Sequence, residues 1–168
     1  MEVEFSHVSF SYPGTDHKIL DDVSFRIKKG GKMALVGING AGKSTIVKLL
    51  CGFYMPDEGH IYINGTDLAT MDLDAWYRSL AAVFQDAFTY SFSIADNVTC
   101  SMGEDYDAEK CREALKDAGL WEKIQKLPQK EKTFIGKEVS EDGIHLSGGE
   151  TQKLMLARAL YKGCALLL

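Results

Sequence analysis

Residues 37–45 read Gly-Ile-Asn-Gly-Ala-Gly-Lys-Ser-Thr, and this spacing suits them to bind phosphate. The three glycines can adopt a positive φ without a Cβ penalty, so consecutive backbone N–H groups can turn inward and surround an anion. A helix that begins at Lys43 adds unpaired N–H groups and the positive end of its dipole. Lys43 would then contact the β and γ phosphates, and Ser44 would coordinate Mg²⁺. The stretch predicts a nucleotide-binding P-loop.

The segments on either side of this loop support the prediction. The apolar run at 33–36 predicts a strand, and the apolar-periodic run at 46–50 predicts a helix that ends at Gly52. The alternative is a chance match in a glycine-rich turn, which composition allows in roughly one unrelated chain of this length in a couple of hundred. The order of strand, glycine loop and helix favours nucleotide binding over that alternative.

A second candidate phosphate site lies at residues 146–150, Leu-Ser-Gly-Gly-Glu. The following stretch, 151–162, has the apolar spacing of a helix and cationic residues near its end. Ser147, Gly148 and Gly149 therefore lie at a helix N-terminus, which offers a hydroxyl, unpaired N–H groups and a positive dipole end. One domain has little need of two γ-phosphate sites, so the second is predicted to serve a nucleotide held by another copy of the chain.

Two single residues are further candidates. Tyr12 stands at the exit of a predicted strand, where its ring could stack on a planar base, although an ordinary turn or core tyrosine is the competing interpretation. Gln85 follows the buried run 80–84, and ligands of open α/β sheets lie beyond the carboxyl ends of the strands. Gln85 could thus reach a metal-bound phosphate or a water, or it is simply a surface loop residue.

The remaining elements follow from hydrophobic periodicity and turn residues. Alternation predicts antiparallel strands at 2–11 and 23–27 and a further strand at 60–65 that stops in an Asn-Gly turn. Helices are predicted at 73–80, from an N-cap at Asp107 to Gly119, and at 120–127. The fold class is α/β: a P-loop core with an antiparallel β part and a helical part.

Composition excludes several functions. The chain has 168 residues and a net charge of −5, so it lacks the broad basic field of a sequence-independent nucleic-acid binder. No apolar run approaches the roughly 18 to 20 residues that span a bilayer, and the start does not resemble a signal peptide. The four cysteines show no metal-ligand spacing and indicate scattered reduced thiols. The chain is cytosolic in character.

Taken in order, Tyr12, the P-loop, Gln85 and the Leu-Ser-Gly-Gly-Glu signature resemble the nucleotide-binding domain of ATP-binding cassette (ABC) transporters along essentially the whole chain. The resemblance implies that Tyr12 stacks on adenine and that Gln85 contacts Mg²⁺ and signals to a transmembrane domain. It also implies that Ser147, Gly148 and Gly149 close over ATP held by a second nucleotide-binding domain in a head-to-tail dimer. The implied ATP- and Mg²⁺-binding residues are Tyr12, Gly37, Asn39, Gly40, Ala41, Gly42, Lys43, Ser44, Thr45, Gln85, Ser147, Gly148 and Gly149, with Ser44 and Gln85 as metal ligands.

Two further stretches resemble the exporter branch of this family. Residues 91–98 are similar to the exporters' loop and short I-x-x-N-[IV] helix, and residues 134–138 are similar to their T-x-[IV]-G-E segment, which contacts the coupling helices. The sequence also departs from the family pattern at two positions. Glu150 stands where Gln is commoner, and Lys137 lies between Gly136 and Glu138.

The end of the chain bears on catalysis. Residues 165–168 read as the start of the strand that in the family leads to the Walker B aspartate and the glutamate general base, so these residues and the switch histidine would lie beyond Leu168. The expected parts are an antiparallel β part (1–31), a P-loop core (32–86), a helical insert with the signature (87–162) and the start of the Walker B strand (163–168).

The function this implies is the ATPase domain of an ABC transporter, an exporter at the cytoplasmic face of the plasma membrane, with no nucleic-acid partner. By itself, the stretch 1–168 is expected to bind nucleotide without turnover. The alternative is a non-transport ABC ATPase that acts on DNA or ribosomes, which would need a basic surface or a long coiled-coil insertion.

Overall fold

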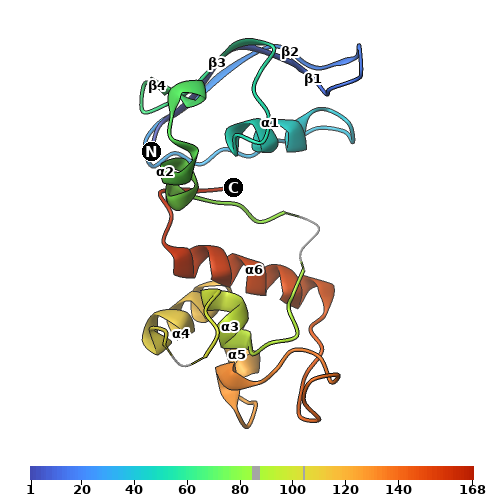
Figure 1. Cartoon of the computed structure of the whole chain (residues 1–168), viewed down its shortest axis with the longest axis vertical. Helices are drawn as coiled ribbons and strands as arrows, with labels where there is room; N and C mark the ends of the chain where they lie inside the picture. Colours follow the sequence, from blue (N-terminus) through green and yellow to red (C-terminus); the bar gives the residue numbers. More distant parts are fainter. Residues whose placement is uncertain (85–87, 104) are drawn as a thin grey trace. The chain divides into compact units, whose positions relative to one another are not determined.

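Figure 1 shows the computed structural model of the chain, which describes residues 1–84, 88–103 and 105–168. The chain divides into two units, Met1–Leu80 together with Leu168, and Ala81–Leu167. The finer boundaries expected at residues 31, 86 and 162 stay predictions.

The first unit is built on a four-stranded antiparallel sheet. Its strands β1 (Val3–Ser11), β2 (Lys18–Ile27), β3 (Glu58–Ile63) and β4 (Thr66–Asp67) lie in the order β2-β1-β3-β4 (Figure 1). β1 is one of the two inner strands, and its alternate residues Val3 and Phe5 are buried. The ring of Phe5 stacks on that of Phe25 across the strand pair, with centroids 4.5 Å apart. The two predicted N-terminal strands are confirmed, and β2 begins five residues before the predicted start at 23.

The predicted Asn-Gly turn joins β3 to β4. Asn64 and Gly65 both have positive φ, 49° and 81°, as the two central residues of a type I′ hairpin turn require. The backbone N–H of Glu2 donates to the Asn64 side chain at 2.8 Å, and this bond fixes the turn against the start of β1.

Three short helices complete the first unit: α1 (Lys43–Leu50), the 3₁₀ helix η1 (Leu68–Thr70) and α2 (Leu73–Ser79). Asp72 caps α2 by accepting from the N–H of Asp74. Trp76 of α2 is fully buried, and its indole N–H donates to the carbonyl of Leu50 at 3.0 Å. This bond satisfies one of the last carbonyls of α1 and ties the two helices together.

The predicted strand at 33–36 is wrong. Residues 32–37 have no regular structure, and the side chain of Val36 is 93% exposed. A β-strand forms only where another strand pairs with it. Among the described residues, the strands that pair are the four of the antiparallel sheet and the short pair β5 (Leu80–Ala81) and β6 (Leu166–Leu167). The predicted strand at 80–84 is correspondingly shorter than expected, since only β5 forms.

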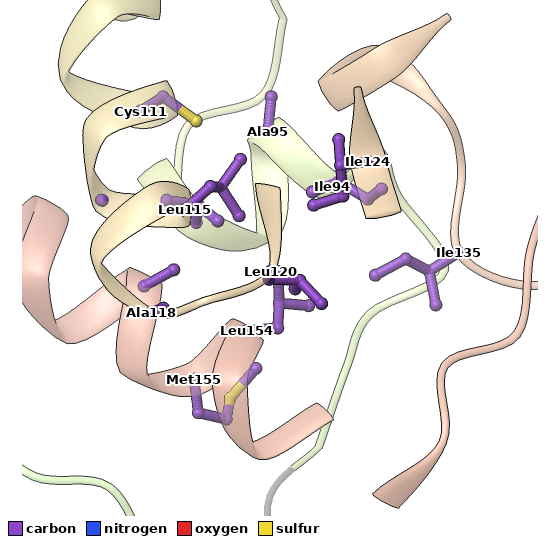
Figure 2. Close-up of a cluster of buried hydrophobic side chains, with 13 residues drawn as sticks. Ile94, Ala95, Cys111, Leu115, Ala118, Leu120, Ile124, Ile135, Leu154 and Met155 are labelled. Carbon is purple, nitrogen blue, oxygen red and sulfur yellow. The ribbon is translucent and has the colours of Figure 1, made fainter. Parts of the chain in front are cut away.

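The second unit is helical. It contains α3 (Ile94–Thr99), α4 (Ala108–Asp117), α5 (Trp121–Ile124), the 3₁₀ helix η2 (Lys130–Lys132) and α6 (Gly148–Lys162). Figure 2 shows how side chains of these helices form one apolar cluster, to which α6 contributes Leu154 and Met155. Asp107 caps α4 as predicted, and Cys111, Ala114, Leu115 and Ala118 are buried. The helix expected at 120–127 is shorter, because α5 ends at Ile124.

Within the described residues, no helix is long and apolar enough to cross a membrane.

Candidate nucleotide-binding site

The P-loop geometry in the first unit suits an anion. Gly40 and Gly42 have φ values of 84° and 83°, in the left-handed region, and α1 begins directly after Gly42. At such a helix start the first N–H groups have no intrahelical partner. The Lys43 ammonium donates to the carbonyls of Gly37 and Ile38 at 2.8 and 2.7 Å, so it lies over its own loop. A phosphate group that enters the loop would offer this ammonium a charged acceptor in place of two neutral ones.

Other P-loop residues contribute through the turn and the helix. The N–H of Ala41 donates to the carbonyl of Ile38 at 3.3 Å, which closes the turn that contains Asn39. Ser44 is exposed in the first turn of α1, whereas Thr45 is buried. The described residues hold no cluster of three or more His, Cys, Asp or Glu side chains.

Tyr12 is anchored beside α1. Its hydroxyl shares a hydrogen bond with the Thr45 hydroxyl at 3.1 Å and accepts one from the Lys48 ammonium at 3.4 Å. The rings of Phe10 and Tyr54 contact it edge-on, with centroids 5.1 and 5.3 Å away. The structure therefore brings Tyr12 together with the helix that follows the P-loop, and the Lys48 ammonium lies over the half-buried Tyr12 ring, 5.3 Å from its centroid.

The signature motif in the second unit starts α6. Ser147 is the N-cap, and the N–H of Glu150 donates to its hydroxyl at 3.4 Å. In return, the Glu150 carboxylate accepts from the N–H of Ser147 at 2.9 Å, which completes a capping box. A Cβ placed on Gly148 or Gly149 would meet nothing within 4 Å, so this helix start has open space in front of it.

A lysine that the sequence analysis missed contacts the signature. The Lys123 ammonium of α5 donates to Glu150 Oε2 at 2.8 Å, the same oxygen that accepts from Ser147. The Lys123 hydrogen bond and the Ser147 N–H lower the pKa of Glu150 from 4.5 to about 2. Periodicity could not reveal this pair, since the two residues lie 27 positions apart on different helices.

This shift predicts how the pair responds to pH. Because the pKa of Glu150 is lower in the folded chain, the stabilisation by its carboxylate is complete above pH 4.5 and is lost as the pH falls towards about 2. Lys123→Met is expected to raise the pKa of Glu150 towards 4.5, measured by NMR titration of the carboxyl carbon. Lys126→Met, which removes a neighbouring charge, is the control. An unchanged Glu150 pKa in Lys123→Met would contradict the assignment.

The two stretches that resemble exporters lie together in the second unit. The N–H of Ile135 donates to the carbonyl of Phe92 at 2.9 Å, and the N–H of Ile94 donates to the carbonyl of Thr133 at 2.9 Å. The exposed rings of Tyr90 and Phe92 lie beside these bonds, with centroids 6.3 Å apart. The two stretches are thus hydrogen-bonded to each other, and an aromatic patch (Tyr90 and Phe92) lies at the start of the first one.

Asn97, the asparagine of the I-x-x-N-[IV] helix, has a structural role. It is 1% exposed, accepts from the N–H of Tyr90 at 2.9 Å and donates to the Tyr90 carbonyl at 2.9 Å. The Arg158 side chain of α6 donates to the Asn97 carbonyl at 2.7 Å. Asn97 of α3 is therefore hydrogen-bonded both to Tyr90 of the aromatic patch and to Arg158 of α6. Gln85, the remaining candidate, lies outside the described residues.

Comparisons with known proteins agree with these features. The family model described as ABC transporter matches residues 20–168. The chain is 38% identical over 167 residues to the ATP-dependent lipid A-core flippase of Yersinia pestis, covering 99% of this chain and 28% of that protein. It is 39% identical over 168 residues to the ABC-type transporter fsqE of Aspergillus fumigatus, covering 99% of this chain and 13% of that protein.

A solved structure gives the same result for the fold. The structure of a bacterial Atm1-family ABC exporter with ATP bound matches with a TM-score of 0.86 and 37% identity, over 99% of this chain and 28% of that one. The chain thus spans about a quarter of the length of the flippase and of the exporter. The family model matches residues 20–168 of the chain, and the P-loop and the signature each lie at a helix start. The chain therefore belongs to the ABC transporter family.

Proposed function

We propose that this chain is the ATP-binding part of an exporter-type ABC transporter, in which ATP binding and hydrolysis drive transport across a membrane. The observation that carries the proposal is the P-loop, where left-handed Gly40 and Gly42 precede α1 and the Lys43 ammonium lies over the loop. Tyr12 would stack on the adenine, and Ser44 and Gln85 would hold Mg²⁺. The relatives named above are transporters, so nothing in them favours the alternative of an ATPase that acts on DNA or ribosomes.

The proposed partners are a second nucleotide-binding domain and a transmembrane domain. Ser147, Gly148 and Gly149 of one copy would close over ATP on the P-loop of the other. A helix leaves its first N–H groups without intrahelical partners, and a Cβ on Gly148 or Gly149 would meet nothing within 4 Å. The aromatic patch would contact the transmembrane domain, because exposed aromatic side chains are typical of an interaction surface. We propose the cytoplasmic face of the plasma membrane as the location of the chain.

Within this proposal the protein positions groups and neutralises charge. Ser44 and Gln85 would hold Mg²⁺, whose charge would offset that of the phosphates. Lys43 and the N–H groups at the start of α1 would bind the β and γ phosphates. Such preorganised donors are the main contribution that a protein makes to phosphoryl transfer.

Lys43→Ala tests the proposed function directly. Loss of the charge-assisted bond is expected to weaken ATP binding by roughly 1.5 to 3 kcal/mol, or about 10- to 150-fold, measured by isothermal titration calorimetry. Lys29→Ala, which removes an exposed lysine outside the loop, is the control and should bind ATP like the wild type. Equal ATP affinity of Lys43→Ala and the wild type would refute the role of Lys43.

Residues 1–168 expressed alone are expected to release no phosphate from ATP above the rate of a blank without protein. The residues of 1–168 that we assign to the nucleotide bind phosphate, adenine or Mg²⁺, and none of them is assigned as a general base, a group that contributes about 100- to 10,000-fold to such reactions. Phosphate release at steady state is the measurement. Turnover near one per second that depends on Lys43 would contradict this expectation.

A further inference from the structure

The pair formed by Lys123 and Glu150 is the strongest feature that the proposed function leaves unexplained. It joins α5 to the first turn of α6 and lies beside a hollow lined in part by Lys123, Lys126, Glu150 and Lys153. Glu150 Oε2 accepts both the Lys123 ammonium and the Ser147 N–H, at 2.8 and 2.9 Å. The Glu150 carboxylate therefore links Lys123 to Ser147 of the signature.

Lys123 is held where it can make this bond. Leu120 and Ile124, which flank it, are buried in the apolar cluster, so α5 has a fixed position against α6. The ammonium of Lys153 on α6 donates to the Gly119 carbonyl just before α5, at 3.1 Å. Lys123 of α5 thus bonds to α6, and Lys153 of α6 bonds to Gly119, just before α5.

The negative charge of Glu150 affects both the helix α6 and a phosphate that approaches its start. A carboxylate in the first turn of a helix stabilises the helix through its dipole. The same carboxylate is also a negative charge at the place where the proposed function brings the γ phosphate of a second copy. Like charges at an interface weaken association, so an unpaired Glu150 would oppose binding of the phosphate.

We propose that Lys123 is a positioning residue for the signature: it keeps the Glu150 carboxylate turned back onto the Ser147 N–H and offsets its charge. The N–H groups of Gly148 and Gly149 then face the approaching phosphate without a competing anion. The inference rests on the proposed function, because it presumes that the signature meets a nucleotide on another copy.

The test is a double-mutant cycle in the full-length protein, with ATP-dependent dimerisation of its nucleotide-binding domains as the measurement. Lys123→Met is expected to raise the ATP concentration needed for dimerisation about tenfold. In the Glu150→Gln background there is no charge to offset, so Lys123→Met should add no further loss. Lys123→Arg keeps the charge and should retain dimerisation, and Lys126→Met is the control that removes a charge from the same hollow.

The cycle separates positioning from a general loss of stability. If Lys123 only stabilises α5, Lys123→Met will weaken dimerisation equally in both backgrounds, and this result would overturn the proposal. No effect of Lys123→Met in the wild-type background would overturn it as well. Failure of the proposed function has a different signature: the wild type would then form no ATP-dependent dimer, or Lys43→Ala would dimerise as readily as the wild type.

Discussion

Ser147→Arg is expected to abolish ATP-driven dimerisation and ATP hydrolysis in the full-length protein, while each subunit still binds ATP nearly as tightly as the wild type. The P-loop that binds ATP is unchanged, but the signature loses its hydroxyl and gains a long side chain in front of Gly148 and Gly149. A Cβ on either glycine would meet nothing within 4 Å, so this open surface is where added bulk would block a partner. Calorimetry measures ATP binding, and light scattering measures the dimer.

A mixture of two variants distinguishes action on the other copy from action within one chain. Lys43→Ala damages the P-loop and Ser147→Arg damages the signature. In a head-to-tail dimer of the two, one composite site carries both lesions and the other carries neither, so the mixture should recover ATP-dependent dimerisation that each variant lacks. If both motifs serve the same chain's nucleotide, every site carries one lesion and nothing recovers. Absence of recovery beside normal wild-type dimerisation would count against the head-to-tail assignment.

Gly59→Ala is expected to destabilise the sheet of the first unit by about 4 kcal/mol or more. Gly59, the second residue of β3, has a φ of 81°, and a Cβ there would lie 2.2 Å from the His7 carbonyl oxygen and 2.4 Å from that of Ser6. These are backbone atoms of β1, so the clash cannot be relieved by a rotamer change. The loss approaches the whole stability of a typical domain, roughly 5 to 15 kcal/mol.

Gly65→Ala is the matched control, because Gly65 has the same φ of 81° but open space around its Cβ position. It should cost only the left-handed strain of about 1 to 2 kcal/mol. Denaturant unfolding followed by circular dichroism measures both variants. If the two substitutions lower the free energy of unfolding equally, the close approach of β1 to Gly59 does not contribute to the loss of stability, and the prediction is wrong.

Local patterns predicted most of the fold correctly. Alternation located β1 and β3, the Asn-Gly pair located the turn at Asn64, and capping residues located the start of α4 at Asp107 and of α6 at Ser147. These signals work because each depends on a few neighbouring residues. The P-loop and the signature were also readable, since their function requires fixed residue types at fixed spacing.

The errors came from interactions between distant segments. The run at 33–36 has the apolar residues of a buried strand, but a strand forms only where another pairs with it, and no described strand pairs with these residues. Lys123 and Asn97 were not assigned contacts for the same reason. Each is explained by a partner, Glu150 and Arg158, that the fold brings to it from a distant position.

The burial of Trp76 gives the first unit its own optical signal. The chain has two tryptophans: Trp76, whose indole is bonded to the Leu50 carbonyl in the first unit, and Trp121, which packs at the edge of the apolar cluster in the second. A buried indole emits at shorter wavelength than one in water, so Trp121→Phe leaves a fluorophore that reports on the helices beside the P-loop alone. Trp76→Phe leaves one that reports on the signature unit. Melting and nucleotide response of the two units can therefore be followed separately in the same chain.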